Sequence, residues 1–454
     1  MPYTDIPSKR IEAHSKICAS TVVHVLSRVM QEKVAADNVL ATHFRNNHFL
    51  GARDRRIITE TLFSVLRWWG WLRNIAPAEF PLPRQAADGS EILPSPNDWF
   101  ACLAASWLLE GRMELPPSAS WWLYQSGVPG NAIPSLPPQP SIRLRRHCLK
   151  PFFSKEDSLP AMPLSDLVPP WCMSHIDCDN QANLIEWLQT RPPVWLRAQT
   201  NDLDRLIAEF SHNDIHISRH ETMKHALKAN FSGINLQTLP AYENGIFEVQ
   251  DAASQAISLI CAPNPGEHWW DCCAGAGGKT LHLSWLMKRK GIIQASDNRA
   301  FKLEELKKRA RRSGIPNIIC KEWLGIDVPR LHNVFNGVLV DAPCTCSGTW
   351  RRNPGLRWTT EEDSIAKSTA LQKTLLDNAS PCVMPGGVLV YATCSMFREE
   401  NTGIIKEFLD NHRDFILEPF QSPLTGIQTP GFLQIWPWDS DCDAMFVAKF
   451  RKKQ

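Results

Sequence analysis

None of the apolar runs in this sequence approaches the roughly 20 residues that a membrane-spanning helix needs, and the amino terminus shows no signal-peptide pattern. The charges almost cancel, at 49 basic and 47 acidic residues, so the composition gives no overall sign of nucleic-acid binding. The 14 cysteines include no Cys-x-x-Cys pair and no cluster with histidine, which argues against a metal site. We therefore expect a cytoplasmic protein with free thiols and with neither a membrane nor a metal among its partners.

The chain is too long for one ordinary domain, since 454 residues predict two or three. Apolar residues at helical spacing after Asp54, a candidate helix cap, predict a helical domain over residues 1–125. Proline pairs predict an extended linker over 126–170. Short strands and a helix predict a small α/β module over 171–245, and residues 246–454 contain the motifs that indicate chemistry.

Two cysteines each follow a short aliphatic run. Cys344 comes just after residues 337–340, and Cys394 comes just after 387–391. Such runs are typical of buried parallel strands, and ligands bind at the C-terminal ends of strands in open α/β sheets. We expect both thiols to reach one pocket. The alternative is that both are core cysteines, because free cysteine is among the most buried residue types.

A glycine-rich segment follows a third strand-like run, residues 268–272, and leads into a helix. Strand, glycine turn and helix form the layout of a nucleotide-cofactor loop, and a second strand at 291–297 ends in Asp297, which can accept both ribose hydroxyls. The loop matches neither the dinucleotide spacing nor the phosphate-loop frame, so it favours neither NAD nor ATP. The loop residues are Cys273, Ala274, Gly275, Ala276, Gly277, Gly278 and Lys279.

These motifs resemble those of the RsmB (Sun) family of RNA cytosine-5 methyltransferases, which use S-adenosylmethionine. The similarity covers the glycine loop, the run 341–354 and the Thr-Cys-Ser run around Cys394, in family order. It extends to residues 250–255 before the loop and to Glu-Glu-Asn at 399–401.

The resemblance implies a fold of class α/β. A C-terminal Rossmann-like methyltransferase domain with a mostly parallel sheet would follow a small α/β module that grips RNA and an N-terminal helical domain similar to NusB. It also implies S-adenosylmethionine as methyl donor and RNA, most of all small-subunit ribosomal RNA, as partner. We expect the protein to be a monomer.

The resemblance also implies roles for single residues. Cys394 would be the nucleophile, and Cys344 would be the thiol that helps release the product. Asp341 would contact both the base and the methyl-donor site. The glycine loop would wrap the donor, with Asp297 on its ribose, and Asp327 is the candidate acid on the adenine side.

The chemistry of cytosine agrees with these roles. Carbon 5 is a poor nucleophile, but a thiolate bonded to carbon 6 converts the ring into an enamine that can take a methyl group from a sulfonium. The attacking thiol needs a lowered pKa or a nearby base. The proton on carbon 5 must then leave before the thiol is eliminated, which is a task for Cys344 or a water that it positions. The target base must be unstacked or single-stranded.

Two departures from the family pattern concern the site. Residues 274–278 read Ala-Gly-Ala-Gly-Gly where the family has Ala-Ala-Pro-Gly-Gly, so flexible residues replace a stiff proline. Cys346 adds a thiol where the family commonly has a small residue.

Local groups of basic residues offer candidate RNA contacts. Arg351 and Arg352 follow the Asp-Ala-Pro-Cys motif and are expected to hold substrate phosphates, and Lys279 is expected near the base. The basic run 302–312 is more typical of a solvated helix face. The arginines within 53–56 fit either a solvated helix start or a phosphate contact.

Three alternatives remain open at this stage. The first is a catalytically weak RNA-binding assembly factor of the same fold, which the intact Asp341, Cys344 and Cys394 argue against. The second is a nucleotide-dependent oxidoreductase with redox thiols, which the loop spacing argues against. The third is a DNA cytosine methyltransferase, in which the Pro-Cys thiol, here Cys344, would attack instead of Cys394.

Overall fold

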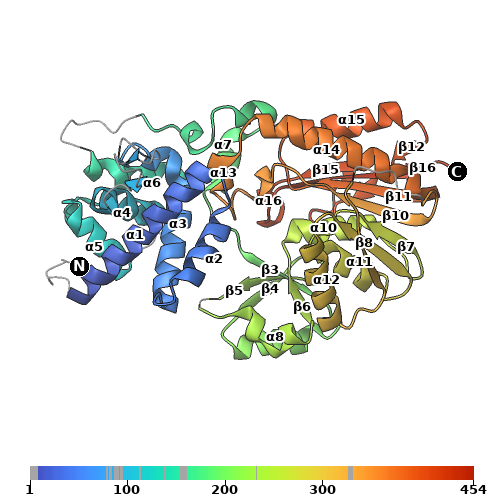
Figure 1. The fold of residues 1–454 in the computed structure, drawn as a ribbon, viewed down its shortest axis with the longest axis horizontal. Helices are drawn as coiled ribbons and strands as arrows, with labels where there is room; N and C mark the ends of the chain where they lie inside the picture. The colour runs from blue at the N-terminus through green and yellow to red at the C-terminus, as the bar shows by residue number, and fades with distance from the viewer. Residues whose placement is uncertain are drawn as a thin grey trace. The chain divides into compact units, whose positions relative to one another are not determined.

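The computed structural model describes residues 9–77, 80, 84–85, 91–92, 96–111, 114–137, 140–153, 161–231, 233–325 and 331–454 (Figure 1). The chain divides into two compact units. The helical unit comprises residues up to 174 together with 178–191 and 350–361, and the sheet unit comprises 175–177, 192–349 and 362–454. No helix in the described ranges combines the length and the apolar character needed to cross a bilayer.

The helical unit confirms the helices expected near the amino terminus. Helix α1 packs against α2, α3 and α5, and α3 also packs against α4. Helix α3 begins at Ala52, so Asp54 lies in its first turn, where its carboxylate accepts a hydrogen bond of 2.7 Å from the Gly51 N–H. Its bounds and those of the other helices are α1 Lys9–Glu32, α2 Ala36–Asn46, α3 Ala52–Leu72, α4 Phe100–Leu109, α5 Pro117–Gln125, α6 Ile142–Arg145, α7 Gln181–Leu188 and α13 Leu356–Thr359; two short strands are β1 Arg84–Gln85 and β2 Glu91–Ile92.

The segment 126–170 differs from the extended linker that its prolines predict. Within its described residues, Leu149 and Leu167 are fully buried, and Ser141 caps the short helix α6. The physical reason is that apolar side chains between the prolines find a core to enter, which proline spacing alone does not reveal. This segment and α7 therefore belong to the helical unit.

The small α/β module is a four-stranded antiparallel sheet in the order β4-β5-β3-β6, with α8 packed on it. Its core includes Leu196, Phe210 and Phe247, all fully buried. The last strand ends at Val249, a little beyond the expected boundary. The elements are β3 Val194–Ala198, α8 Leu203–His212, β4 His216–Arg219, β5 Ala226–Asn230, α9 Pro240–Glu243 and β6 Phe247–Val249.

The large sheet has the strand order β12-β16-β11-β10-β7-β8-β9, with β15 also paired to β16. Strands β7 to β11 run parallel, and β16 is antiparallel to β11, which confirms the mostly parallel sheet. The strands are β7 His268–Asp271, β8 Ile292–Asp297, β9 Ile318–Glu322, β10 Phe335–Asp341, β11 Val383–Thr393, β12 Phe415–Leu417, β15 Phe432–Ile435 and β16 Met445–Lys452; a separate pair is β13 Phe420–Gln421 and β14 Gln428–Thr429.

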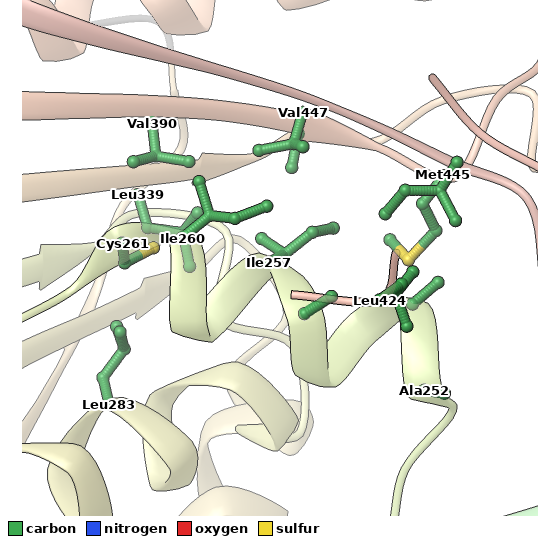
Figure 2. Close-up of a cluster of buried hydrophobic side chains, with 14 of the residues drawn as sticks. Ala252, Ile257, Ile260, Cys261, Leu283, Leu339, Val390, Leu424, Met445 and Val447 are labelled. Atoms are coloured by element: carbon green, nitrogen blue, oxygen red, sulfur yellow. The ribbon is translucent and has the colours of Figure 1, made fainter. Parts of the chain in front are cut away.

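Helices cover both faces of this sheet (Figure 1). Alternation along each strand sends Leu339 and Val390 to one face, where they meet Ile257 and Ile260 of α10 (Figure 2). Their neighbours along the strands face α14 and α15. The helices are α10 Ala252–Cys261, α11 Gly278–Leu286, α12 Ala300–Arg312, α14 Asp363–Ala379, α15 Thr402–Asn411 and α16 Pro437–Ser440.

The order of the strands fixes where a ligand binds. The chain starts the sheet at β7, adds β8 and β9 on one side, and then returns to place β10 and β11 on the other. The C-terminal ends of β7 and β10 therefore flank a topological switch point, which is where open α/β sheets bind ligands.

The packed face of β10 predicts a stability effect. Truncating Leu339, which is fully buried, leaves a cavity between the sheet and α10, so Leu339→Ala should lower the free energy of unfolding by about 2–5 kcal/mol. Ile319→Ala on β9 is the control, because the Ile319 side chain is about half exposed and its loss should change stability by roughly 0.5 kcal/mol or less. Chemical denaturation of the two variants measures both effects, and equal losses would contradict this packing.

Candidate active site

The ends of β10 and β11 bring the two predicted thiols together. The strands are parallel neighbours with Asp341 opposite Ala392, so the turns that follow them lie side by side. The Sγ atoms of Cys344 and Cys394 are 3.3 Å apart, and both residues are partly exposed. Two unrelated core cysteines would be fully buried and would not contact each other, so this geometry argues against the alternative that both thiols only fill the core.

Cys346 completes a cluster of three thiols, whose Sγ atoms all lie within 4.8 Å of one another. Hydrogen bonds from Cys344 and Cys394 lower the pKa of the Cys346 thiol to about 4. The pKa of Cys344 is raised well above its usual value, chiefly by the hydrogen bond with Cys346. For Cys394, the hydrogen bond with Cys344 lowers the pKa, but Cys346 and burial outweigh it and raise the pKa well above the usual value. Of the three thiols, Cys346 therefore loses its proton first, and a second proton is lost only with difficulty.

A buried ion pair lies beside the thiols. The Lys279 Nζ donates to Asp341 Oδ2 at 2.7 Å, and Lys279 is only 8% exposed. Burial lowers the pKa of Lys279, but the charge of Asp341 and its hydrogen bond raise the pKa by more, and the charge of Cys394 adds to this rise. Lys279 therefore stays protonated and supplies a positive charge beside Cys394.

The carboxylate of Glu400 ties together the two turns that carry the thiols. It accepts hydrogen bonds from the Thr345 N–H at 3.0 Å, the Thr345 hydroxyl at 2.6 Å and the Gln372 amide at 2.9 Å, and also from the Ser395 hydroxyl. Burial raises the pKa of Glu400 in spite of these donors. Thr345 stands between Cys344 and Cys346, and Ser395 follows Cys394, so one side chain positions all three thiols. The sequence indicated Glu400 only as part of a family motif.

The turn after β11 has a second brace. Asn401 accepts a hydrogen bond from the Thr393 hydroxyl at 2.6 Å and donates one to the Ser395 carbonyl at 2.9 Å. Glu400 and Asn401 together hold the backbone on both sides of Cys394.

Replacing Glu400 tests this arrangement. Glu400→Ala leaves the Thr345 N–H without its buried acceptor and leaves the Gln372 amide with the Pro343 carbonyl alone, at a cost of about 1–3 kcal/mol each, so the free energy of unfolding should fall by roughly 2–6 kcal/mol. Cys344 and Cys394 should also cross-link more slowly under mild oxidation, because their turns are no longer joined. Glu399→Ala is the matched control: Glu399 is partly exposed and pairs with His175, so its loss should cost about 1 kcal/mol or less. Equal effects in the two variants would overturn the role of Glu400.

A cavity of about 410 Å³ opens beside Asp341 at the switch point. The glycine loop forms one wall, and side chains after β8 and β9 and on α14 form the others. The lining residues include Cys273, Ala274, Gly275, Asp297, Arg299, Trp323, Leu324, Asp341, Pro343, Leu371 and Leu375.

The glycine loop is held in a conformation that needs its glycines. Gly277 has a φ of 85°, and a Cβ there would approach Leu306 Cγ to 2.5 Å. The loop lacks the family's proline, but Arg309 on α12 donates to the Ala276 carbonyl at 2.7 Å and pairs with the buried Glu248 at 2.9 Å. Arg309 therefore fixes the position of the loop. Unlike the solvated helix face expected for the basic run 302–312, its side chain makes structural contacts.

Asp297 lies at the end of β8 and lines the cavity, as expected. Its carboxylate accepts from the Gly275 N–H at 2.9 Å and from the Arg299 guanidinium at 2.9 and 3.1 Å. Burial raises the pKa of Asp297, but these hydrogen bonds outweigh it and lower the pKa below its usual value. Arg299 was not predicted from the sequence, although it stands only two residues after Asp297 and contacts it locally. Asp327 lies outside the described residues.

The two arginines expected to hold phosphate belong to the helical unit. Arg351 is only 1% exposed, donates to the Thr190 hydroxyl at 2.9 Å and lies 5.0 Å from the centre of the Trp187 ring. The expectation for Arg351 is therefore corrected, because its guanidinium is buried in packing contacts and not open to phosphate. Arg352 is partly exposed.

The sheet order, the glycine loop at the switch point and the paired thiols define a Rossmann-like methyltransferase. The family model described as 16S rRNA methyltransferase RsmB/F matches residues 258–451. A relative named probable ribosomal RNA small subunit methyltransferase B, from Synechocystis sp., is 33% identical over 310 residues, which cover 61% of this chain and 68% of the relative. The chain belongs to this RsmB/F family, which confirms the resemblance seen in the sequence.

Other relatives agree with this assignment. Ribosomal RNA small subunit methyltransferase B from Pasteurella multocida is 31% identical over 297 residues, covering 63% of this chain and 65% of the relative. The match therefore spans about two thirds of the length of these curated relatives. The crystal structure of PH0851 superposes with a TM-score of 0.72 at 26% identity and covers 96% of this chain and 99% of the other. NSun6 from Pyrococcus horikoshii, at 21% identity and a TM-score of 0.56, covers 62% of this chain and 96% of its own and shares the fold.

Proposed function

We propose that this protein methylates carbon 5 of a cytosine in small-subunit ribosomal RNA, with S-adenosylmethionine as donor and a transient covalent bond between Cys394 and the base. The observation that carries the proposal is the contact between Cys394 and Cys344, at 3.3 Å, beside a cavity lined by the glycine loop. The names of the curated relatives support the choice of RNA.

The cavity suits the proposed donor. Backbone groups of the glycine loop can approach its methionine and ribose parts, and Asp297 offers carboxylate oxygens to the ribose. Trp323 and Leu371 offer an apolar wall to the adenine. When bound, S-adenosylmethionine supplies an electrophilic methyl group on a sulfonium. A ribose at Asp297 has to share that carboxylate with Arg299, whose exposed side chain is free to move toward solvent.

The first step of the proposed reaction belongs to Cys394. Its thiolate attacks carbon 6 of the cytosine, a bond forms between sulfur and carbon, and the electron pair of the ring double bond becomes available at carbon 5. The nearby Lys279 ammonium favours this thiolate, whereas the more acidic Cys346 beside it raises the pKa of Cys394 and opposes it. Asp341, held in place by Lys279, hydrogen-bonds the base through a proton shared with ring nitrogen 3.

Release of the product belongs to Cys344. Once carbon 5 has accepted the methyl group, it still carries a proton that must leave. Cys344, or a water that it positions, removes this proton, the ring double bond re-forms, and the bond to the Cys394 sulfur breaks to return the thiolate. Arg352 and the small antiparallel sheet are the proposed contacts to RNA outside the reacting base, with Lys279 near the base itself.

Trapping the covalent adduct tests these roles. Incubated with RNA and donor, Cys344→Ala should accumulate protein that stays bound to RNA on a denaturing gel, because elimination is blocked, whereas Cys394→Ala should accumulate none. Because Cys346 is close enough to replace Cys344 as a base, the double variant Cys344→Ala/Cys346→Ala should accumulate more adduct than the single one.

The other outcomes discriminate among the alternatives. The reverse pattern, with adduct in Cys394→Ala only, would point to Cys344 as nucleophile, as in DNA cytosine methyltransferases. Donor binding without adduct or methylated RNA in any variant would support the non-catalytic assembly factor instead. Sequencing of 5-methylcytosine in ribosomal RNA from cells with and without the protein then identifies the target.

Donor binding gives a separate test. Asp297→Ala removes the proposed ribose acceptor and releases the Gly275 N–H, so donor affinity should fall at least about tenfold, as expected when a charged hydrogen bond worth about 1.5–3 kcal/mol is lost. Glu304→Ala is the control, because Glu304 lies on the exposed face of α12 and pairs only with Lys307 among the contacts described. Equilibrium dialysis with labelled donor measures both variants. Unchanged binding in Asp297→Ala would place the donor elsewhere.

A further inference from the structure

The three-thiol cluster has a property that the proposed methyl transfer does not use. Cys344 and Cys346 come from the turn after β10 and Cys394 from the end of β11, and none of the three is fully buried. Two thiols suffice for the reaction, so the third needs another explanation. The sequence argued against a metal site because its cysteines lack metal-binding spacing, but the fold brings together thiols that are far apart in the chain.

We propose that Cys344, Cys346 and Cys394 bind a thiophilic divalent cation of the Zn²⁺ class, and that the bound cation blocks the nucleophile. Thiolates are the ligands that such cations prefer. With bonds of about 2.3 Å in tetrahedral geometry, ligand sulfurs lie about 3.8 Å apart. The three sulfurs already lie within 4.8 Å of one another, and one pair lies 3.3 Å apart. Shifts of about 1 Å or less therefore complete the geometry.

The backbone presents Cys346 to this site. Its φ of 57° is in the left-handed region, which a residue with a side chain seldom adopts. Neighbouring hydrogen bonds maintain it: Gly348 N–H donates to the Cys394 carbonyl at 2.9 Å, and Thr349 N–H donates to the Cys346 carbonyl at 3.0 Å. A strained residue that its surroundings hold this firmly is typical of a functional site.

Local charges do not exclude a cation. The nearby Lys279 ammonium repels a cation, but the Asp341 carboxylate that pairs with it at 2.7 Å offsets part of this repulsion. Binding exchanges protons for the metal, since each thiol that coordinates releases its proton to solvent, and no electron is transferred. Within the described residues the cluster supplies three ligand atoms, which leaves the fourth position to water.

The consequence for activity rests on the proposed function. A thiolate that is bonded to the metal gives up electron density and is held in place by that bond, so the coordinated Cys394 sulfur attacks carbon 6 far more slowly than the free thiolate. Zinc would thus inhibit methyl transfer by binding Cys394, and Cys344 and Cys346 would strengthen this binding as additional ligands.

The binding test uses the full-length, reduced protein freed of metal by a chelator and then titrated with Co²⁺, whose thiolate complexes absorb in the near ultraviolet. The wild type should bind one equivalent, and Zn²⁺ should displace it. Cys346→Ala should bind at least about tenfold more weakly, because one of three thiolates is lost. Cys320→Ala, which removes a partly exposed thiol elsewhere in the same unit, should bind like the wild type.

A further variant separates this site from the other candidate group in the described residues, His14, Cys18 and Asp54. Cys18→Ala should retain the cobalt signal. The proposal is overturned if Cys18→Ala loses the signal, if Cys346→Ala binds like the wild type, or if the wild type shows no thiolate absorption. Circular dichroism of each variant verifies that it is folded.

The activity test follows methyl transfer to RNA at increasing Zn²⁺. Wild-type activity should fall over the same concentrations at which the site fills, and Cys346→Ala should require at least about tenfold more metal for equal inhibition. Full activity of the wild type with its site saturated would overturn the blocking. Absence of methyl transfer without metal would instead overturn the proposed function, and the cobalt titration would still decide whether the metal site exists.

Discussion

The buried carboxylate of Glu400 joins two turns that the sequence places far apart, and the geometry of the thiols depends on it. Removing a carboxylate from water is costly, and burial does raise the pKa of Glu400. Four donors compensate, and they come from both thiol-bearing turns and from α14. A network in which every donor has its acceptor is rigid, so the contact between Cys344 and Cys394 is determined by the fold and does not depend on the mobility of two loops.

The thiols also lie beside a buried ion pair that affects their charge. The Lys279 ammonium stays protonated because Asp341 is beside it, and the charge of Cys394 also raises the pKa of Lys279. Among the three thiols, the pKa is lowered at Cys346 and raised at Cys344 and Cys394. Cys346 has no assigned role in the family pattern, and its thiol has the lowest pKa of the three in the cluster. A third thiol therefore alters both the acidity of the site and its affinity for soft cations.

The sequence predicted the parts of this site that local patterns encode. Short aliphatic runs identified β10 and β11, and the glycine loop and Asp297 identified the ends of β7 and β8, because strand ends and glycine turns have local signatures. The burial of Arg351 has no such signature, since it arises from tertiary packing. The pairing of Arg299 with Asp297 is local, but a basic residue in the sequence does not show which acid it contacts. A basic residue in the sequence shows charge but not exposure, so arginines were the least predictable members of the site.

The glycine loop lacks the proline that stiffens it in the family, and tertiary contacts restrict its backbone instead. Gly275 and Gly277 give the loop freedom, and the Ala276 carbonyl is fixed by Arg309 from α12. Arg309 is in turn fixed by Glu248, a buried residue on β6 of the small antiparallel sheet, which also binds Arg312. A buried carboxylate between two arginines resists separation strongly, because breaking the contact would leave charges without partners. The glycine loop is therefore anchored to the small sheet, so a movement of that sheet would reach the loop through one ion pair and one hydrogen bond.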